Sequence, residues 1–216
     1  MAHLVSPSQE GLAKAMSLNE LTGVRDRKTA IRDEVRGQLK AIASPVRSAA
    51  SNQACQLLRQ QKIWQNARAI LFYAPLSDEL DLSPLWKECL EQGKTVALPR
   101  FAAEQNAYVP CRVDHFKQPM ARGRFGVLEP DGDSPRLPSN QLDLILVPGV
   151  AFDMSGRRVG RGRGFYDRLL RDIRGAKCGV GFDEQIRAEI PVEPHDICLN
   201  YLLTPTRWLD VSLMGL

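Results

Sequence analysis

The sequence predicts a single three-layer α/β/α domain, in which helices cover both faces of a largely parallel sheet. Short apolar runs alternate along the chain with segments of helical periodicity, a pattern typical of strands joined by right-handed crossovers. The 216 residues, 44% of them hydrophobic, suffice for one large domain with a sizeable core. No repeat or low-complexity segment interrupts the pattern.

Two helices are predicted at the start of the domain. Residues 1–24 are small and polar with little periodicity, so we expect a flexible N-terminal arm there and the folded domain at residues 25–216. Helix 26–44 follows, because its apolar residues recur at steps of three and four: Ile31, Val35, Leu39 and Ile42. Ser44 is expected to cap a second helix, 44–61, whose first turn begins with a proline.

The middle of the chain predicts two strands joined by a helix. The apolar runs 69–74 and 95–99 are typical of short buried strands. Between them, a second serine–proline pair begins a helix that ends at Gly93. Segment 101–140 contains several prolines and glycines, which suits a meander or hairpin beside the main sheet.

The last predicted elements are strand 142–148, helix 164–175 and strand 177–182. The first of these is the most clearly apolar run in the chain, and Gly175 closes the helix. A loop rich in glycine and arginine lies between strand 142–148 and the helix.

Composition and charge exclude several classes of protein. An ordinary apolar fraction and a net charge of +4 argue against disorder throughout and against nucleic acid as a partner. No run approaches ~18 apolar residues and the first residues lack a signal-peptide pattern, so we expect a cytoplasmic protein that does not bind membranes. The five cysteines include no Cys-x-x-Cys pair and are predicted to be free thiols.

The loop after strand 142–148 carries the first functional signal. It has five glycines from Gly149 to Gly164, and glycine lets backbone N–H groups turn toward an anion. Seven arginines lie between Arg157 and Arg174, and guanidinium groups pair with phosphate oxygens. The P-loop pattern is absent. The spacing favours phosphate binding, and a solvated basic face or an RNA patch is the alternative.

Two carboxylates near this loop are candidate magnesium ligands. Asp167 begins the following helix, where it could hold a cation that bridges phosphates or could simply complement the helix dipole. Asp196 follows the last predicted strand and is the candidate second ligand, with a turn residue as the alternative.

At this loop the sequence resembles the 5-formyltetrahydrofolate cyclo-ligase family. The family's PG-x-x-FD and R-x-G-x-G-x-G-Y-Y-D motifs stand here as PGVAFD (148–153) and RVGRGRGFYD (158–167). Further matched pieces are Lys28 with Arg32, PLSDELD (75–81), ALPR (97–100), FGVLEP (125–130) and the stretch from FDEQI to HD (182–196). The resemblance covers roughly residues 28–205.

The resemblance implies a Rossmann-like fold shared with phosphosugar isomerases and coenzyme A transferases, and an ATP- and Mg²⁺-dependent ligase. The implied reaction cyclises 5-formyltetrahydrofolate to 5,10-methenyltetrahydrofolate and releases ADP and phosphate. Arg161 and Arg163 match catalytic positions, and Asp167 and Asp196 match magnesium positions. The ATP-binding positions correspond to Lys28, Arg32, Arg158, Gly160, Arg161, Gly162, Arg163, Gly164, Phe165 and Tyr166. On sequence alone, the favoured interpretation of Lys28 and Arg32 is that they are solvated residues of an amphipathic helix.

The family's substrate-binding positions correspond to Ala74, Glu79, Phe125, Arg161 and Phe165. Glu79 matches the glutamate that holds the pterin, whose amino-pyrimidinone edge presents two adjacent N–H donors. Phe125 could stack on the pterin or belong to the core. Two departures stand out: Phe165 replaces the first tyrosine of the Tyr-Tyr pair, and Leu82 replaces a common threonine.

Two other functions remain open at this point. One is a catalytically silent family member that binds nucleotide or folate, and the other is a phosphometabolite isomerase or transferase of the same fold. The expected partner is a small molecule, 5-formyltetrahydrofolate with or without a polyglutamate tail. We expect the protein to be a monomer.

Overall fold

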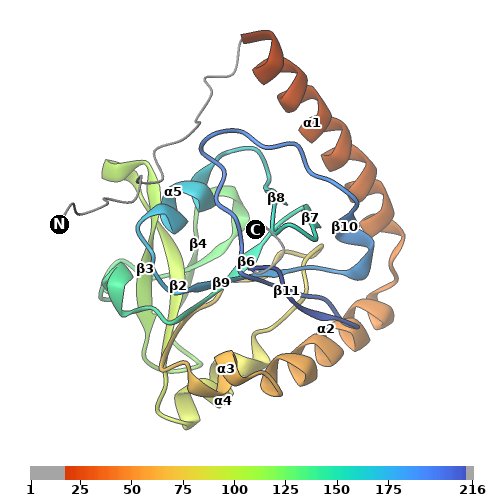
Figure 1. Cartoon of the computed structure of the whole chain (residues 1–216). Coiled ribbons are helices and arrows are strands. Elements are labelled where there is room, and N and C mark those ends of the chain that lie inside the picture. Colours follow the sequence, from red (N-terminus) through yellow and green to blue (C-terminus); the bar gives the residue numbers. More distant parts are fainter. Residues whose placement is uncertain (1–17, 213–216) are drawn as a thin grey trace, which may run out of the picture.

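The computed structural model describes residues 18–212, and its centre is a seven-stranded sheet (Figure 1). In spatial order the strands are β12 (Trp208–Asp210), β11 (Tyr201–Leu203), β9 (Ala176–Val180), β6 (Leu144–Pro148), β1 (Ala69–Leu71), β2 (Thr95–Ala102) and β3 (Ala107–Val113). The five inner strands are parallel, and β12 and β3 pair antiparallel at the two edges. The predicted mostly parallel sheet is confirmed.

Five helices accompany the sheet in the described residues. They are α1 (Leu18–Ala41), α2 (Ser44–Arg59), α3 (Lys62–Asn66), α4 (Pro84–Glu91) and α5 (Phe165–Arg171). In Figure 1, α2, α3 and α4 lie on one side of the sheet and α5 on the other. Alternate strand residues serve the two sides, because side chains along a strand point to opposite faces. Leu144 and Leu146 of β6 join one core, whereas Ile145 and Val147 join the other core, together with Leu170 of α5. The three-layer arrangement is therefore confirmed.

Helix α1 begins at Leu18, earlier than the predicted start at residue 26, and takes in residues 18–24 of the predicted arm. The buried face of the helix continues upstream through Lys28 to Val24. The lysine at this buried position interrupted the apolar pattern that the prediction followed. Residues 1–17 of the predicted arm lie outside the described part of the chain.

Other element boundaries also differ from the prediction. Ser44 is already inside α2, whose N-cap position is Ala43, and no side chain caps that helix end. The second helix ends at Arg59, and α3, which follows it, was not predicted. Helix α5 ends at Arg171 rather than near Gly175.

Small sheets and short helical turns complete the fold. Strands β4 (Met120–Arg122) and β5 (Leu128–Pro130) form the hairpin expected within 101–140. The segment predicted as a glycine loop contains strands β7 (Ala151–Asp153) and β8 (Arg158–Val159), and β7 pairs with both β8 and β10 (Ile186–Arg187). The 3₁₀ turns are η1 (Ala103–Gln105), η2 (Arg124–Gly126), η3 (Ser139–Gln141) and η4 (Asp183–Gln185).

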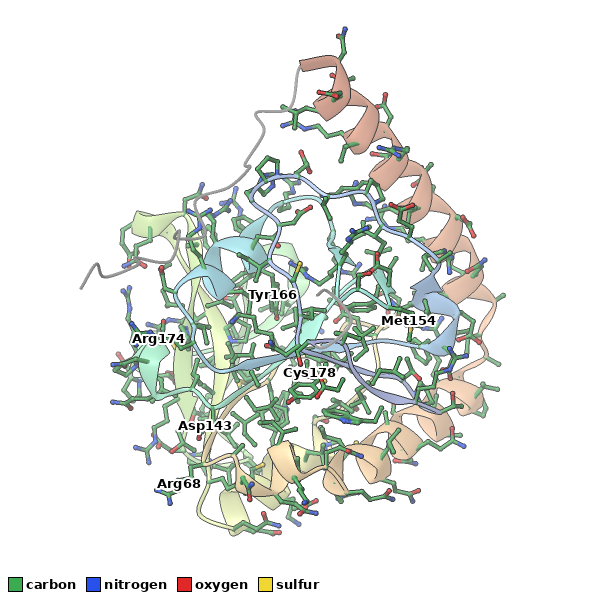
Figure 2. The ribbon with its side chains drawn as sticks, in the orientation of Figure 1. Arg68, Asp143, Met154, Tyr166, Arg174 and Cys178 are labelled. Atoms are coloured by element: carbon green, nitrogen blue, oxygen red, sulfur yellow. The ribbon has the colours of Figure 1, made fainter. Side chains whose placement is uncertain are left out.

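One carboxylate connects the amino ends of the central strands β1 and β6. Asp143 Oδ2 accepts hydrogen bonds from the backbone N–H groups of Arg68 (2.8 Å) and Ala69 (2.9 Å), and Figure 2 shows Arg68 and Asp143 together at one end of the sheet. The opposite, carboxyl ends of the strands are thus left to form the site.

The cysteines and the helices bear on two expectations from the composition. All five cysteines are free, as predicted, and four of them are buried. Within residues 18–212, no helix has both the length and the apolar character needed to cross a membrane.

Candidate functional site

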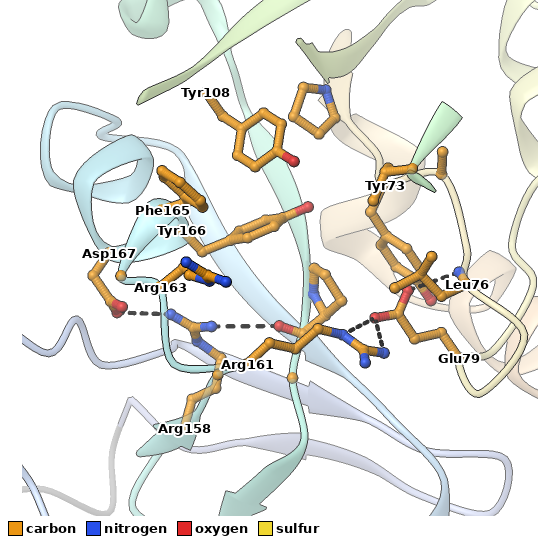
Figure 3. Close-up of a pocket in the computed structure, with 17 residues that line it drawn as sticks. Tyr73, Leu76, Glu79, Tyr108, Arg158, Arg161, Arg163, Phe165, Tyr166 and Asp167 are labelled. Atoms are coloured by element: carbon orange, nitrogen blue, oxygen red, sulfur yellow. Dashed lines mark hydrogen bonds and ion pairs between the residues drawn. The ribbon is translucent and has the colours of Figure 1, made fainter. Parts of the chain in front are cut away.

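A cavity of about 220 Å³ opens at the carboxyl ends of β1 and β6 (Figure 3). The chain runs from β1 outward to β2 and returns to place β6 on the other side of β1, so the order of strands reverses here. Ligands of open α/β sheets bind at such reversals. The cavity is lined by Tyr73, Ala74, Leu76, Glu79, Pro99, Tyr108, Val127, Pro148, Gly149, Arg158, Gly160, Arg161, Arg163, Gly164, Phe165, Tyr166 and Asp167. We call it the first cavity.

The floor of the first cavity depends on close packing at Gly149. A Cβ there would lie 2.6 Å from the Phe152 ring and 3.0 Å from Arg158 Cγ, so only glycine fits. Gln185 fixes the same turn, because its side-chain amide donates to the carbonyls of Gly149 (2.7 Å) and Val150 (2.9 Å). The matched PG and FDEQI pieces therefore meet in space and support one loop.

Asp153 organises the β7–β8 hairpin that follows. Its Oδ1 accepts from the N–H groups of Ser155 (2.9 Å) and Arg157 (3.0 Å), and its Oδ2 accepts from Ile190 N (2.9 Å). This buried carboxylate shapes the turn and does not reach the cavity lining.

The glycines after β8 bring the chain back to the cavity. Gly162 (φ 96°) and Gly164 (φ 63°) have left-handed backbone conformations, which residues with a Cβ rarely adopt. These two positions turn Arg161 and Arg163 into the cavity wall (Figure 3).

Arg161 joins two neighbouring carboxylates at one end of the first cavity. Its Nη2 lies 2.7 Å from Asp78 Oδ1 and 2.9 Å from Glu79 Oε1, and its Nε lies 3.3 Å from the same Glu79 oxygen. Glu79 is nearly buried and its Oε2 accepts from Leu76 N (3.0 Å). Burial raises the pKa of Glu79, although the charge of Arg161 works in the opposite direction. Glu79 and Arg161, two of the five residues predicted to bind the substrate, are thus in direct contact.

Aromatic rings form another wall of the first cavity. Phe165 packs edge to face against Tyr108 of β3 (centroids 5.6 Å apart) and Phe101 of β2 (5.4 Å), and Tyr166 packs against Tyr108 (6.3 Å). Figure 3 shows the hydroxyls of Tyr108 and Tyr166 directed into the cavity. A tyrosine hydroxyl is a neutral donor near neutral pH, and burial raises the pKa of Tyr108 further, to about 12. A flat apolar ligand with polar edges would fit this wall.

Arg158 and Asp167 form a buried ion pair beneath the arginine loop. The Arg158 side chain is 3% exposed, and its Nη2 lies 2.6 Å from Asp167 Oδ1. Arg158 lines only the first cavity, whereas Asp167 also lines the second cavity described next. The positive charge of Arg158 is therefore paired with the carboxylate of Asp167.

The second cavity lies between α1, the start of α5 and the loop after β10. It is lined by Arg25, Lys28, Thr29, Arg32, Gly162, Arg163, Gly164, Asp167, Arg168, Arg171, Glu193 and His195. Arg32 donates from Nε to Gly160 O (2.8 Å), which ties α1 to the glycine segment. The six cationic side chains of this lining make it suited to an anionic ligand.

Lys28 is held between two carboxylates beside the second cavity. Its Nζ lies 2.9 Å from Glu193 Oε2 and 2.5 Å from Asp196 Oδ2. The hydrogen bond and charge of Lys28 lower the pKa of Glu193, although burial works against this change. Lys28 and Arg32, one helical turn apart, both face the cavity, as expected for residues on one face of a helix.

Of the two candidate metal ligands, Asp196 belongs to a cluster of possible metal ligands, whereas Asp167 does not. Ligand atoms of Glu193, His195 and Asp196 lie within 4.8 Å of one another, and Asp167 is not part of this group. Asp167 uses Oδ1 for Arg158, and Asp196 uses Oδ2 for Lys28 and for Glu193 N. Each carboxylate keeps a second oxygen that could ligate a cation.

The two cavities share part of their lining, which consists of Arg163, Gly164 and Asp167. Most residues predicted for the site line one or both cavities. Asp196 lies next to the second cavity through Lys28 and Glu193. Phe125 belongs to η2, and its side chain lies outside the described part of the chain.

Several residues that line the cavities were missed in the sequence. Tyr73 and Pro99 come from segments predicted as buried strands and Tyr108 from the predicted meander or hairpin, and no local pattern marks them. Arg168 and Arg171 belong to the local excess of arginine, which could have indicated them.

Fold and site together define an α/β enzyme with its site at the carboxyl ends of a parallel sheet. The profile of the 5-formyltetrahydrofolate cyclo-ligase family matches residues 24–205. The 5-formyltetrahydrofolate cyclo-ligase of Mycolicibacterium smegmatis is 36% identical over 66% of this chain and 76% of its own length. The mouse enzyme of the same name is 28% identical over 83% of this chain and 94% of its own.

Solved structures agree with this assignment. The 5,10-methenyltetrahydrofolate synthetase of Aquifex aeolicus has a TM-score of 0.76 and 31% identity, covering 85% of this chain and 92% of its own. The synthetase of Mycoplasma pneumoniae, with a TM-score of 0.66 and 20% identity, shares the fold. The chain belongs to the 5-formyltetrahydrofolate cyclo-ligase family, and it is an enzyme of the ligase class.

Proposed function

We propose that the protein catalyses the ATP- and Mg²⁺-dependent cyclisation of 5-formyltetrahydrofolate to 5,10-methenyltetrahydrofolate, with release of ADP and phosphate. The observation that carries this proposal is the shared lining of the two cavities at Arg163, Gly164 and Asp167. One cavity suits a flat heterocycle, the other suits a triphosphate, and the reacting groups of the two ligands would meet where the linings join.

The folate is assigned to the first cavity. The carboxylate of Glu79 would accept hydrogen bonds from the two adjacent N–H groups of the pterin, and Ala74 and Phe165 would contact the faces of the pterin ring. Because Phe165 has no hydroxyl, Tyr108 and Tyr166 supply the phenolic donors of this wall. Phe125 remains a proposed contact of the pterin.

ATP is assigned to the second cavity. Lys28, Arg32, Arg163 and the backbone of the glycine segment 160–164 would bind the triphosphate. Carboxylate oxygens are the ligands that Mg²⁺ prefers, so Asp167 and Asp196 suit that ion, which would neutralise phosphate charge. This assignment makes the side of α1 that faces the cavity part of the nucleotide site.

The reaction needs alignment more than covalent chemistry from the protein. The formyl oxygen attacks the γ-phosphorus and ADP departs; N10 then attacks the activated formyl carbon, N10 loses its proton and phosphate leaves. Arg161 and Arg163 would hold the formyl oxygen and the transferring phosphoryl group in line and stabilise the negative charge that develops. The substrate itself supplies both nucleophiles.

A spectrophotometric assay tests the proposal directly. Purified protein with 5-formyltetrahydrofolate, Mg²⁺ and ATP should form the methenyl chromophore and phosphate in a ratio of one to one, and neither without ATP. Arg161→Ala should lower turnover about 100-fold, the order of loss seen when one donor to a developing charge is removed. ATP binding without chromophore would identify a catalytically silent family member instead.

A further inference from the structure

The loop that carries Glu79 presents a second carboxylate, Asp78, to the same arginine. Asp78 Oδ1 lies 2.7 Å from Arg161 Nη2, the shortest of the three contacts that Arg161 makes with this loop. The proposed reaction uses Glu79 and Arg161 but gives Asp78 no task. We propose that Asp78 is a positioning residue, which holds Arg161 at the cavity wall when the folate takes over Glu79. This inference rests on the proposed function.

The hydrogen-bond capacity of Glu79 explains why a second carboxylate is needed. A carboxylate has about four acceptor positions, two on each oxygen. Arg161 fills both positions of Oε1, through Nε and Nη2, and Leu76 N fills one position of Oε2. A pterin edge with two adjacent N–H donors needs one position on each oxygen. Folate binding therefore requires Arg161 to give up at least one of its two bonds to Glu79.

The geometry indicates which contact yields. The bond from Nε to Glu79 Oε1 is the longest of the three, at 3.3 Å, whereas Nη2 contacts both carboxylates. If Nε is released, Asp78 still holds Nη2, and the guanidinium can turn its free edge toward the formyl oxygen. Without the Asp78 charge, Arg161 would pair with Glu79 alone and compete with the substrate.

Exposure supports this division between the two carboxylates. The side chain of Glu79 is 9% exposed and lines the cavity, whereas that of Asp78 is 32% exposed and does not line it. The inner carboxylate is thus placed for the substrate, and the outer one is placed for the arginine.

A double-mutant cycle with Asp78→Asn and Arg161→Ala tests the proposal. Folate affinity is measured by calorimetry in all four proteins, because turnover of Arg161→Ala is expected to be small. Asp78→Asn alone should weaken folate binding about threefold to tenfold and lower kcat, with ATP affinity unchanged. In the Arg161→Ala background, Asp78→Asn should change folate affinity no further.

Glu88→Gln is the matched control. Glu88 pairs with Arg59 at 2.7 Å, and the exposures of that pair (27% and 41%) resemble those of Asp78 and Arg161. Glu88→Gln should leave folate affinity and kcat unchanged. Thermal unfolding of each variant shows that it is folded under the assay conditions.

The outcomes separate the two proposals. If wild-type protein shows turnover but Asp78→Asn weakens folate binding equally in both backgrounds, or in neither, Asp78 does not act through Arg161 and the inference is wrong. A folded wild-type protein without turnover would overturn the proposed function, and the task assigned to Asp78 with it.

Discussion

Lys28→Met is expected to destabilise the protein strongly at neutral pH. The Lys28 side chain is 5% exposed, and the two carboxylates that it contacts, Glu193 and Asp196, are 9% and 15% exposed. Removing a buried partner costs about 3–5 kcal/mol, because the remaining charge is left uncompensated. We expect about 3 kcal/mol, since some water reaches Asp196. For a chain of this length that corresponds to a fall in Tm of about 6–12 °C.

The assay is urea unfolding of wild-type and variant proteins without ATP, from pH 7 down to pH 3. The pKa of Glu193 is lowered in the fold, so its ion pair contributes stability above the ordinary glutamate pKa and loses it as the pH falls through the lowered value. The difference between the proteins should therefore narrow in acid. Arg25→Met is the control, because Arg25 contacts Glu193 at 3.2 Å but is 71% exposed, and its loss should cost about 0–1 kcal/mol. Equal losses at pH 7, or a gap that widens in acid, would refute the reasoning.

Three further predictions concern the first cavity and the metal. Gly149→Ala should lower the free energy of unfolding by about 1–3 kcal/mol in a urea titration because its Cβ collides with Phe152, while Gly132→Ala, which meets nothing within 4 Å, should not. Glu79→Ala should raise the KM for folate more than that for ATP. Because the pKa of Glu79 is raised, wild-type folate affinity should fall in mildly acidic buffer before an ordinary glutamate would protonate, and Glu79→Ala should lose this pH dependence. Asp167→Asn should raise the Mg²⁺ concentration needed for half-maximal turnover, and an unchanged requirement would remove Asp167 from the metal site.

The central strands were predictable because each is a continuous apolar run buried on both faces. β1 and β6 fall within the predicted ranges for this reason, and β9 begins one residue before its predicted range. β10, β11 and β12 have only two or three residues each, too few to show a period, and their partners are distant in the sequence. Pairing with the existing sheet, rather than local preference, makes these segments strands.

The candidate site was likewise predictable only in part. The glycine and arginine loop was visible because its residues are neighbours in sequence, and most of them do line the cavities. The ion pairs that fix Arg158, Arg161 and Lys28 were not predictable, because each joins residues from separate elements or from opposite ends of the loop. Tyr108 reaches the cavity only because β3 pairs with β2.

Arg158, Arg161 and Lys28 are paired with carboxylates, so other charges are needed to attract a triphosphate. The second cavity supplies them, because six arginine and lysine side chains line it, against the two carboxylates of Asp167 and Glu193. Even if each carboxylate cancels one cation, a positive excess remains along α1 and α5. The paired residues are held in fixed positions, whereas the excess supplies the attraction. The ion pairs therefore set the shape of the site before ligand arrives, and the surplus arginines determine its charge.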